Sequence, residues 1–367
     1  MMGRPRWALA FVLNLALAAA LQAISPGQPR LSDRQEYEYV GEHGLEANCP
    51  WSVYCYRILV PSMLARIPVA PEARWRGYQL GANTLAGTIV AATAGTMSSG
   101  WAATAIAGLL TQTSFGFAFT AVDPFTADPM VFVISAVITL CWLTNRPAAA
   151  FVAGLVGVFA KETVALMSAT AALAALGTRG RERWPAWVVQ GVVVAGVLLG
   201  FHWVMDTYFG WSIRNNAAAR FSEGSWLALW WANNPGVLRK GFFLFTPFGF
   251  AWLYAAAGFA SAPVALRQLT LGALLPFLAL NYVQNPERAL ANLFFVIVPL
   301  ATVALARVPA AVALGAVLTN GVLTARVGSS SEWLPPAGYL LVPAAVAAAC
   351  VFWFLSAAQT GRAALSR

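Results

Sequence analysis

Charged side chains are scarce in this chain of 367 residues, where they make up 10% of the total, while 59% of the residues are hydrophobic. Soluble domains carry about 25% charged residues, and no soluble fold of this size can bury so much apolar surface. The scarcity of charge therefore excludes a soluble globular protein. Together with a mean hydropathy of +0.65, it predicts an integral membrane protein.

Lysine is almost absent, since Lys161 and Lys240 are the only two lysines in the sequence. The net charge of +9 comes from arginines scattered at the ends of apolar runs. Such a pattern is typical of anchoring at anionic lipid headgroups. We therefore expect membrane lipids, and no nucleic acid, among the partners of this chain.

Known nucleotide and hydrolase motifs are also missing. The sequence has no P-loop, no G-x-G-x-x-G opening a helix, no H-E-x-x-H and no G-x-S-x-G. This excludes a nucleotide-driven pump and a recognisable soluble catalytic domain. The two histidines, His43 and His202, lack the spacing of metal ligands, and a divalent metal held by acidic residues is compatible with the sequence but not required.

Cysteine is rare, with four residues in the whole chain. Cys141 and Cys350 lie in apolar runs and are interpreted as packing residues. Cys49 and Cys55 bracket the segment P-W-S-V-Y in a polar loop, where an oxidising compartment would allow a disulfide. A zinc pair is the less favoured alternative, because the spacing is wrong for common zinc fingers.

Apolar runs recur along the whole chain and predict an all-α, polytopic fold with a single transmembrane domain over 1–367. Spanning takes roughly 20 residues per helix, so we expect about 10 to 12 transmembrane helices. The runs are 7–24, 79–98, 101–121, 130–144, 148–178, 186–204, 241–260, 268–283, 290–306, 309–325 and 338–357. The run 148–178 is interrupted at Lys161 and Glu162, and reading it as two short helices gives the higher number.

Two polar segments interrupt this pattern. The first is an outer loop over 25–71, whose part 56–71 is predicted to be an interfacial helix because it is moderately apolar but carries Arg57 and Arg66. The second is a long outer loop over 205–240. For the first apolar run, a retained span with a cytoplasmic N-terminus is preferred to the alternative, a cleaved signal peptide.

Counting spans from a cytoplasmic N-terminus brings the short basic loops, and also the C-terminal tail, to the inner side, as the positive-inside rule requires. The same count brings 13 of the 14 acidic residues to the outer side, with Glu182 the exception. The pattern predicts one composite site at the outer face of the membrane.

The first outer loop holds five of those acids: Asp33, Glu36, Glu38, Glu42 and Glu46. A general base needs a carboxylate or imidazole within reach of a substrate hydroxyl, and partial burial at a membrane interface raises a carboxyl pKa toward the useful range. Asp33, Glu36 and Glu38 are the candidate catalytic residues. The alternative is that these acids only keep the loop solvated.

Further polar residues stand near the ends or breaks of apolar runs. Lys161 and Glu162 form a costly charged pair within an apolar run, and such pairs usually face a cavity; mutual neutralisation at a helix end is the alternative. The remaining candidates for substrate binding are Arg57, Asp123, Asp128, Glu287 and Arg288. For the two aspartates, capping of the next helix is an equal alternative. For Arg288, the choice lies between phosphate binding at a helix N-terminus and a snorkelling interfacial side chain.

Three stretches resemble polytopic bacterial glycosyltransferases of the GT-C class: D-R-Q-E-Y-E-Y-V with Y-R-I-L-V-P in the first loop, an internal A-K-E-T, and a late P-E-R-A-L-A-N-L-F-F-V-I-V-P. The resemblance implies a catalytic acid in the first outer loop, by position Asp33 with Glu36 or Glu38 as second choice. It also implies a polyprenyl-phosphate-sugar donor whose phosphate contacts Arg288. The chain departs from the class in having no adjacent D-D or D-E pair in this loop and no soluble domain after the last predicted span.

The resemblance and the pattern of polar residues lead to the expectation of a membrane glycosyltransferase that acts at the outer face. The alternative is a transporter of lipid-linked saccharides, or one coupled to ions, in which the intramembrane charges are coupling residues. A transporter is expected to hold its polar residues near mid-membrane, whereas a transferase of this kind holds them at one face.

Overall fold

The structure, a computed structural model, describes residues 4–25, 33–47, 49–50, 52–97, 100–177, 183–211, 236–278, 286–329 and 337–365. Every regular element in these ranges is a helix, which confirms the predicted all-α class. The elements of the first half are α1 (Arg4–Ile24), α2 (Arg34–His43), η1 (Ser52–Tyr56), α3 (Leu59–Ala65), α4 (Pro71–Met97), α5 (Trp101–Thr113), α6 (Phe115–Val122), α7 (Asp128–Leu143), α8 (Pro147–Gly157) and α9 (Thr163–Leu176). The second half contains α10 (Trp184–Phe209), α13 (Val237–Phe245), α14 (Ala251–Phe259), α15 (Val264–Leu278), α16 (Pro286–Leu290), η4 (Ala291–Leu293), α17 (Phe294–Leu305), α18 (Ala310–Ser329) and α19 (Ala337–Leu365).

Several of these helices are long and apolar enough to cross a membrane, so the chain is a multi-pass membrane protein. Among the described residues they number five: Trp7–Ile24, Trp184–Phe209, Glu287–Leu305, Ala310–Ser329 and Ala337–Phe354. α5 and α6 make a sixth candidate as a pair bent by 49°. Four shorter apolar helices, α7, α8, α9 and α15, lie beside them. The finer expectation of about 10 to 12 spans remains a prediction.

Three expected runs are broken helices. The run 148–178 forms two helices, α8 and α9, with Lys161 and Glu162 between them. The run 101–121 bends at Ser114, where α5 gives way to α6. The prediction of one run over 241–260 was wrong, because α13 ends at Phe245 and α14 begins only at Ala251.

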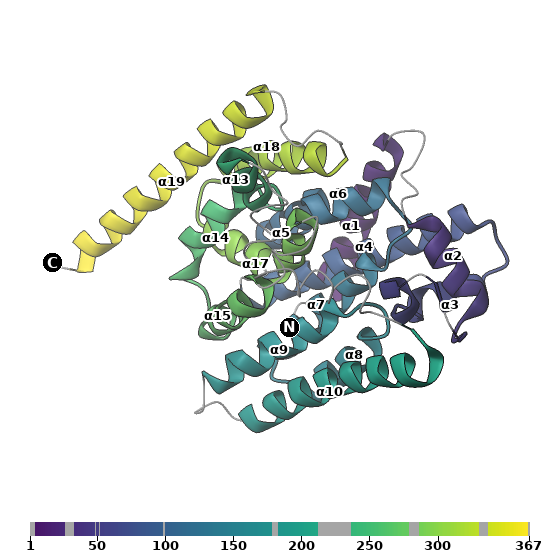
Figure 1. The fold of residues 1–367 in the computed structure, drawn as a ribbon. Coiled ribbons are helices and arrows are strands. Elements are labelled where there is room, and N and C mark those ends of the chain that lie inside the picture. Colours follow the sequence, from purple (N-terminus) through teal and green to yellow (C-terminus); the bar gives the residue numbers. More distant parts are fainter. Residues whose placement is uncertain are drawn as a thin grey trace.

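The segment predicted as an interfacial helix over 56–71 is shorter and lies on the protein itself. Only Leu59–Ala65 is α-helical, and α3 packs against α2. Val60 and Leu64 are buried in a small cluster with Tyr37 and Trp75. Figure 1 shows α2 and α3 together at one side of the bundle, while α19 extends away from its body.

The second long outer loop of the sequence analysis, 205–240, is only partly described. α10 continues to Phe209 and α13 begins at Val237. Residues 212–235 lie outside the described residues.

The first helix is an integral part of the bundle. α1 packs against α4, α5 and α6. Asn14 is fully buried and accepts a hydrogen bond from Gln112 Nε2 at 3.0 Å. Gly87 and Gly108 leave room for this side chain, since a Cβ at Gly87 would stand 2.0 Å from Asn14 Oδ1. Retention of this first span stays a prediction.

Candidate functional site

Six charged side chains meet where several helices end. They are Asp33, Arg57, Asp128, Lys161, Glu162 and Arg288, and together we call them the charge cluster. The turn between α6 and α7 and the turn between α8 and α9 lie at the same end of the bundle, because Lys161 in one contacts Asp128 at the edge of the other. The cluster is therefore at one end of the helices and not midway along them.

Asp128 is the centre of the cluster. Its Oδ1 accepts a hydrogen bond from Lys161 Nζ, and its Oδ2 accepts one from Arg288 Nε at 2.7 Å. Only 3% of its side chain is exposed. A buried carboxylate is costly unless it is paired and hydrogen-bonded, and the two cations supply that pairing. One alternative predicted that Asp128 caps the next helix. Asp128 does stand at the start of α7, but its carboxylate binds these two cations and makes no capping hydrogen bond to the helix.

Arg288 connects three groups. Besides Asp128, it donates from Nη2 to Thr126 Oγ1 at 2.8 Å and approaches Asp33 Oδ2 at 3.8 Å. Its guanidinium lies over the ring of Phe119, 4.7 Å from the centroid. The side chain is 21% exposed, and its Nη1 donates to no partner in the part of the chain that the structure describes. Arg288 can therefore still bind an anion from outside the cluster.

Arg288 lies at the start of a candidate span, Glu287–Leu305, as the sequence analysis placed it. The span begins with α16, a single turn of five residues, and continues directly through η4 and α17. Phosphate binding by the backbone of this terminus stays a prediction. The guanidinium group of Arg288 is the part of this residue that contacts the charge cluster.

Asp33 is the one candidate base of the three that contacts Arg288. It immediately precedes α2, its side chain is 14% exposed, and its Oδ1 accepts a hydrogen bond from Tyr54 at 3.0 Å. Burial and the neighbouring Asp33 carboxylate raise the pKa of Tyr54 above its ordinary value. Tyr54 is therefore a fixed hydrogen-bond donor at neutral pH, and it orients the Asp33 carboxylate.

Arg57 and Glu162 form a two-armed ion pair beside this centre. Arg57 Nε donates to Glu162 Oε2 at 3.0 Å, and Nη2 donates to Oε1 at 2.6 Å. Arg57 Nη1 also donates to the buried Tyr37 hydroxyl at 3.4 Å. Burial alone would raise the pKa of Glu162, but the Arg57 guanidinium outweighs it and lowers that pKa to about 2. The pair fixes the loop before α3 to the break between α8 and α9.

The remaining predicted site residues lie on α2, directly after α6 and on α16. Glu38 pairs with Arg34 at 3.0 Å on α2, and Glu36 is partly exposed on the same helix. Asp123 is buried directly after α6, and Glu287 is partly exposed next to Arg288 on α16.

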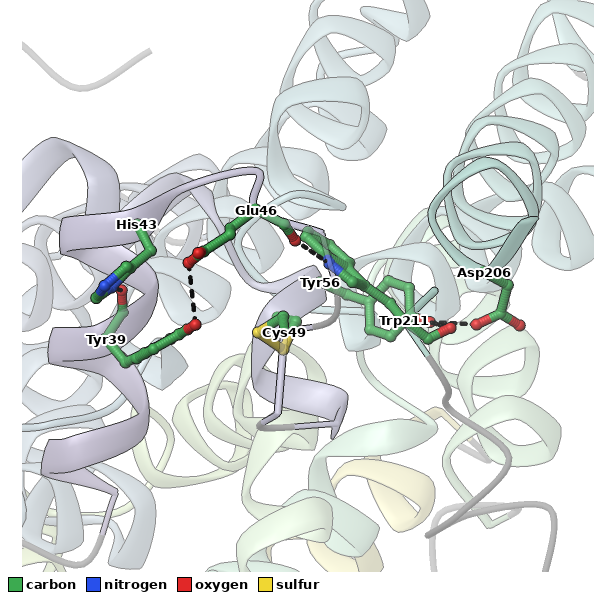
Figure 2. The surroundings of a disulfide bond; sticks show 8 residues. Tyr39, His43, Glu46, Cys49, Tyr56, Asp206 and Trp211 are labelled. Atoms are coloured by element: carbon green, nitrogen blue, oxygen red, sulfur yellow. Dashed lines mark hydrogen bonds between the residues drawn. A yellow bond between two sulfur atoms is a disulfide. The ribbon is translucent and has the colours of Figure 1, made fainter. Parts of the chain in front are cut away.

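The disulfide allowed by the sequence is present and links Cys49 to Cys55, with their Cα atoms 6.1 Å apart. Figure 2 shows its surroundings: the Tyr56 hydroxyl donates to Asp206 at 2.7 Å, and the Trp211 indole donates to the Glu46 carbonyl at 2.6 Å. These contacts tie the first loop to the end of α10. His43 is exposed, stacks on Tyr39 and takes no part in the cluster.

An apolar groove is lined in part by residues that closely follow Arg288 in the chain. It has a volume of about 450 Å³ and lies between α13, α14, α15 and the segment from α16 to α17. Leu290 and Leu293, which follow Arg288 closely in the chain, line it together with Phe245 and Trp252. We call it the first groove.

The sequence left a divalent metal ion compatible with this protein but not required. No three histidine, cysteine or acidic side chains converge among the residues that the structure describes. The carboxylates of Asp128 and Glu162 are already occupied by cationic side chains.

Three contributors to the site were not singled out from the sequence. Tyr54 donates a hydrogen bond to Asp33, and the Tyr37 hydroxyl accepts one from Arg57. Thr126 accepts hydrogen bonds from Arg288 and from the Asp128 amide. Its position between Asp123 and Asp128 was the one signal that pointed to it.

Comparisons with protein-family models, curated proteins and solved structures give no match to this chain. The function must therefore be argued from the geometry of the charge cluster.

Proposed function

We propose that this protein is a membrane glycosyltransferase of the GT-C type. It transfers a sugar from a polyprenyl-phosphate donor to an acceptor hydroxyl at the outer face of a bacterial plasma membrane. The observation that carries the proposal is the order Asp33, Arg288, Asp128. In this order a candidate base, an anion-binding guanidinium and a buried carboxylate follow one another at one end of the bundle.

The donor phosphate binds Arg288. Asp128 holds the guanidinium by Nε, and Thr126 holds Nη2, so the guanidinium is oriented before substrate arrives. Planar arginine forks suit phosphate oxygens better than a lysine ammonium does. Lys161, which the sequence analysis placed among the donor-binding residues, contacts Asp128, and we assign it the role of holding this carboxylate in place.

The first groove takes the polyprenyl chain. Its lining is almost entirely apolar, and one of its residues, Leu290, stands two positions after Arg288 in the chain. Burial of each CH₂ group stabilises binding by about 0.8 kcal/mol. The pairing of a cation with an adjacent apolar groove matches a donor that is a phosphate on a long hydrocarbon.

Asp33 acts as the general base. It removes the proton from the acceptor hydroxyl while the hydroxyl oxygen forms a bond to the anomeric carbon. The bond from that carbon to the phosphate oxygen breaks, and its electron pair leaves with the polyprenyl phosphate. Arg288 stabilises the charge that develops on this leaving group. A single displacement of this kind inverts the anomeric configuration.

The location of the charges favours a transferase over a transporter of lipid-linked saccharides. Coupling residues of transporters lie near mid-membrane, between repeats, whereas the charge cluster lies at helix ends. The positive-inside count makes this end the outer one, with both termini cytoplasmic.

The test uses the purified protein in lipid vesicles with a panel of polyprenyl-phosphate sugars. The proposal predicts release of free polyprenyl phosphate from at least one donor, and loss of that release in Arg288→Gln but not in the control Arg76→Gln. Arg76 pairs with Glu72, four residues earlier on α4, and neither residue belongs to the charge cluster. Movement of intact donor between leaflets without release would instead establish a transporter.

A further inference from the structure

A second apolar groove lies on another side of the bundle. It has a volume of about 440 Å³ and is bounded by α1, α5, α6 and α18. Leu17, Leu109 and Val317 line its apolar part. We call it the second groove.

One end of the second groove is polar. Ser25, Arg326 and Ser329 lie at this end, together with Tyr339 from the start of α19. Residues 317 to 329 of α18 extend about 18 Å at the helical rise of 1.5 Å per residue. The groove therefore offers a long apolar channel with a cationic mouth, which is the shape and charge complementary to an anionic lipid.

The polar end of the second groove belongs to the same end of the bundle as the charge cluster. Ser25 directly follows α1 and stands eight residues before Asp33 in the chain. Ala118 lines the groove, and the next residue, Phe119, lies under the Arg288 guanidinium. α6 is thus a wall shared by the groove and the cluster. Gly328 allows α18 to approach α6 closely, since a Cβ at this position would stand 2.7 Å from the Phe115 carbonyl oxygen.

We infer that the sugar acceptor is itself an anionic membrane lipid, held with its chains in the second groove and its charged headgroup at Arg326. This inference rests on the proposed function. A hydroxyl of the headgroup loses its proton to Asp33 and forms the new bond to the anomeric carbon. The old bond to the donor phosphate breaks, so the products are a glycosylated lipid and polyprenyl phosphate. The two grooves then hold the two amphiphilic substrates of one reaction, on either side of Phe119 and Arg288.

Binding is tested without any need for activity. The full chain is placed in phosphatidylcholine vesicles that contain phosphatidylglycerol with a photoreactive acyl chain, and labelled peptides are mapped after illumination. The inference predicts labelling of α1 and α18 at residues of the second groove. Val322→Trp, which fills the groove from a side chain now 56% exposed, should abolish this labelling. Leu314→Trp, on the same helix but outside the groove and 49% exposed, should leave it unchanged.

A substitution of Arg326 tests the contact between this side chain and the lipid headgroup. Arg326→Gln should lower labelling by about fivefold, the value of one basic side chain near an anionic headgroup. The same vesicles with photoreactive phosphatidylcholine should show weak labelling of the second groove. Equal labelling by both lipids, or labelling of Val322→Trp at the wild-type level, would overturn the inference.

The acceptor role is tested with a donor that carries a labelled sugar. The inference predicts labelled sugar in the lipid extract, and loss of this product in Val322→Trp while donor binding persists. Transfer to a water-soluble acceptor at the wild-type rate in Val322→Trp would overturn the inference and leave the proposed function standing. Absence of any donor turnover in the wild type, with lipid labelling intact, would instead remove the proposed function.

Discussion

Arg288 is held unequally by two carboxylates. Asp128 accepts from its Nε at 2.7 Å, while Asp33 stands 3.8 Å from Nη2. An incoming phosphate can displace the longer contact without breaking the shorter one. Donor binding would then free the Asp33 carboxylate to act on the acceptor, so that binding and activation of the base are linked.

A conservative substitution at Arg288 tests this arrangement. Arg288→Lys keeps the charge but loses the planar fork, so it cannot donate to Asp128, Thr126 and a phosphate together. We expect donor affinity to fall by roughly tenfold or more, which is the change in affinity expected when one charge-assisted hydrogen bond is lost. Donor affinity is measured by equilibrium binding in nanodiscs, with Arg76→Lys as the control. An unchanged affinity in Arg288→Lys would mean that Arg288 serves only to anchor its helix.

The Arg57–Glu162 pair gives a pH-dependent prediction. The pKa of Glu162 falls from 4.5 to about 2 in the folded protein, so the pair stabilises the fold above pH 4.5 and this stabilisation is lost as the pH falls toward 2. The melting temperature of Glu162→Gln should lie below that of the wild type by a constant margin from pH 7 to 5. The margin should narrow below pH 4.5. If the melting temperatures of Glu162→Gln and the wild type already became equal above pH 6, the ion pair between Arg57 and Glu162 would be contradicted.

The identities of the charged residues were easier to predict than their partners. All six members of the charge cluster were candidates, because charge is rare in this chain and each residue interrupts or borders an apolar run. The partners could not be predicted, since Arg288 and Asp128 are 160 residues apart in sequence. Tyr54 carried no signal of its own, because a tyrosine in a polar loop is equally consistent with stacking and with hydrogen bonding.

At the scale of the helix, small residues set the packing around α17, which follows Arg288 in the chain. Gly258 on α14 lies against α17 so closely that a Cβ would stand 2.1 Å from the Leu300 carbonyl oxygen. The obstructing atom belongs to the backbone and cannot rotate away. The position of α17, and with it that of Arg288, therefore depends on this glycine.

Gly258→Ala should destabilise the protein by about 1–3 kcal/mol through overpacking. Gly200→Ala is a matched control, since a Cβ at Gly200 on α10 meets nothing within 4 Å. Thermal unfolding in detergent measures both. Equal stability of the two variants would show that α14 and α17 do not pack as closely as described.

The break between α13 and α14 shows why helix ends were harder to predict than apolar runs. Gly249 has a φ of +54°, and the side chain of Asn320 on α18 accepts from the Phe250 amide at 2.7 Å and donates to the Phe248 carbonyl at 3.2 Å. A distant asparagine thus satisfies the backbone of the turn. No feature within 241–260 reveals that partner, whereas the charges of Lys161 and Glu162 revealed the break between α8 and α9.

At the scale of the whole molecule, the first loop is fastened to the bundle at several points. The disulfide closes a short loop beside Tyr56, whose hydroxyl reaches Asp206 at the end of α10. The neighbouring Arg57 reaches Glu162. The loop that carries Asp33 is therefore connected to the end of α10 and to the break between α8 and α9.

Removal of the disulfide should loosen this fastening. The double variant Cys49→Ser/Cys55→Ser should lose roughly 2 kcal/mol of stability, the value expected for so short a closed loop. Its melting temperature should match that of the wild type in reductant, and reductant should have no further effect on the variant. A wild-type melting temperature that does not respond to full reduction would contradict this role.

The most direct test of the account is the rate of polyprenyl-phosphate release by Asp33→Asn in lipid vesicles, with its preferred donor and acceptor. The account predicts a loss of roughly 10² to 10⁴-fold, the contribution of a general base, with unchanged melting temperature and donor affinity. Glu42→Gln, an exposed acid on the same α2 helix, should keep the wild-type rate. Full activity in Asp33→Asn would contradict the account, and a loss in Glu36→Gln or Glu38→Gln instead would move the base to that glutamate.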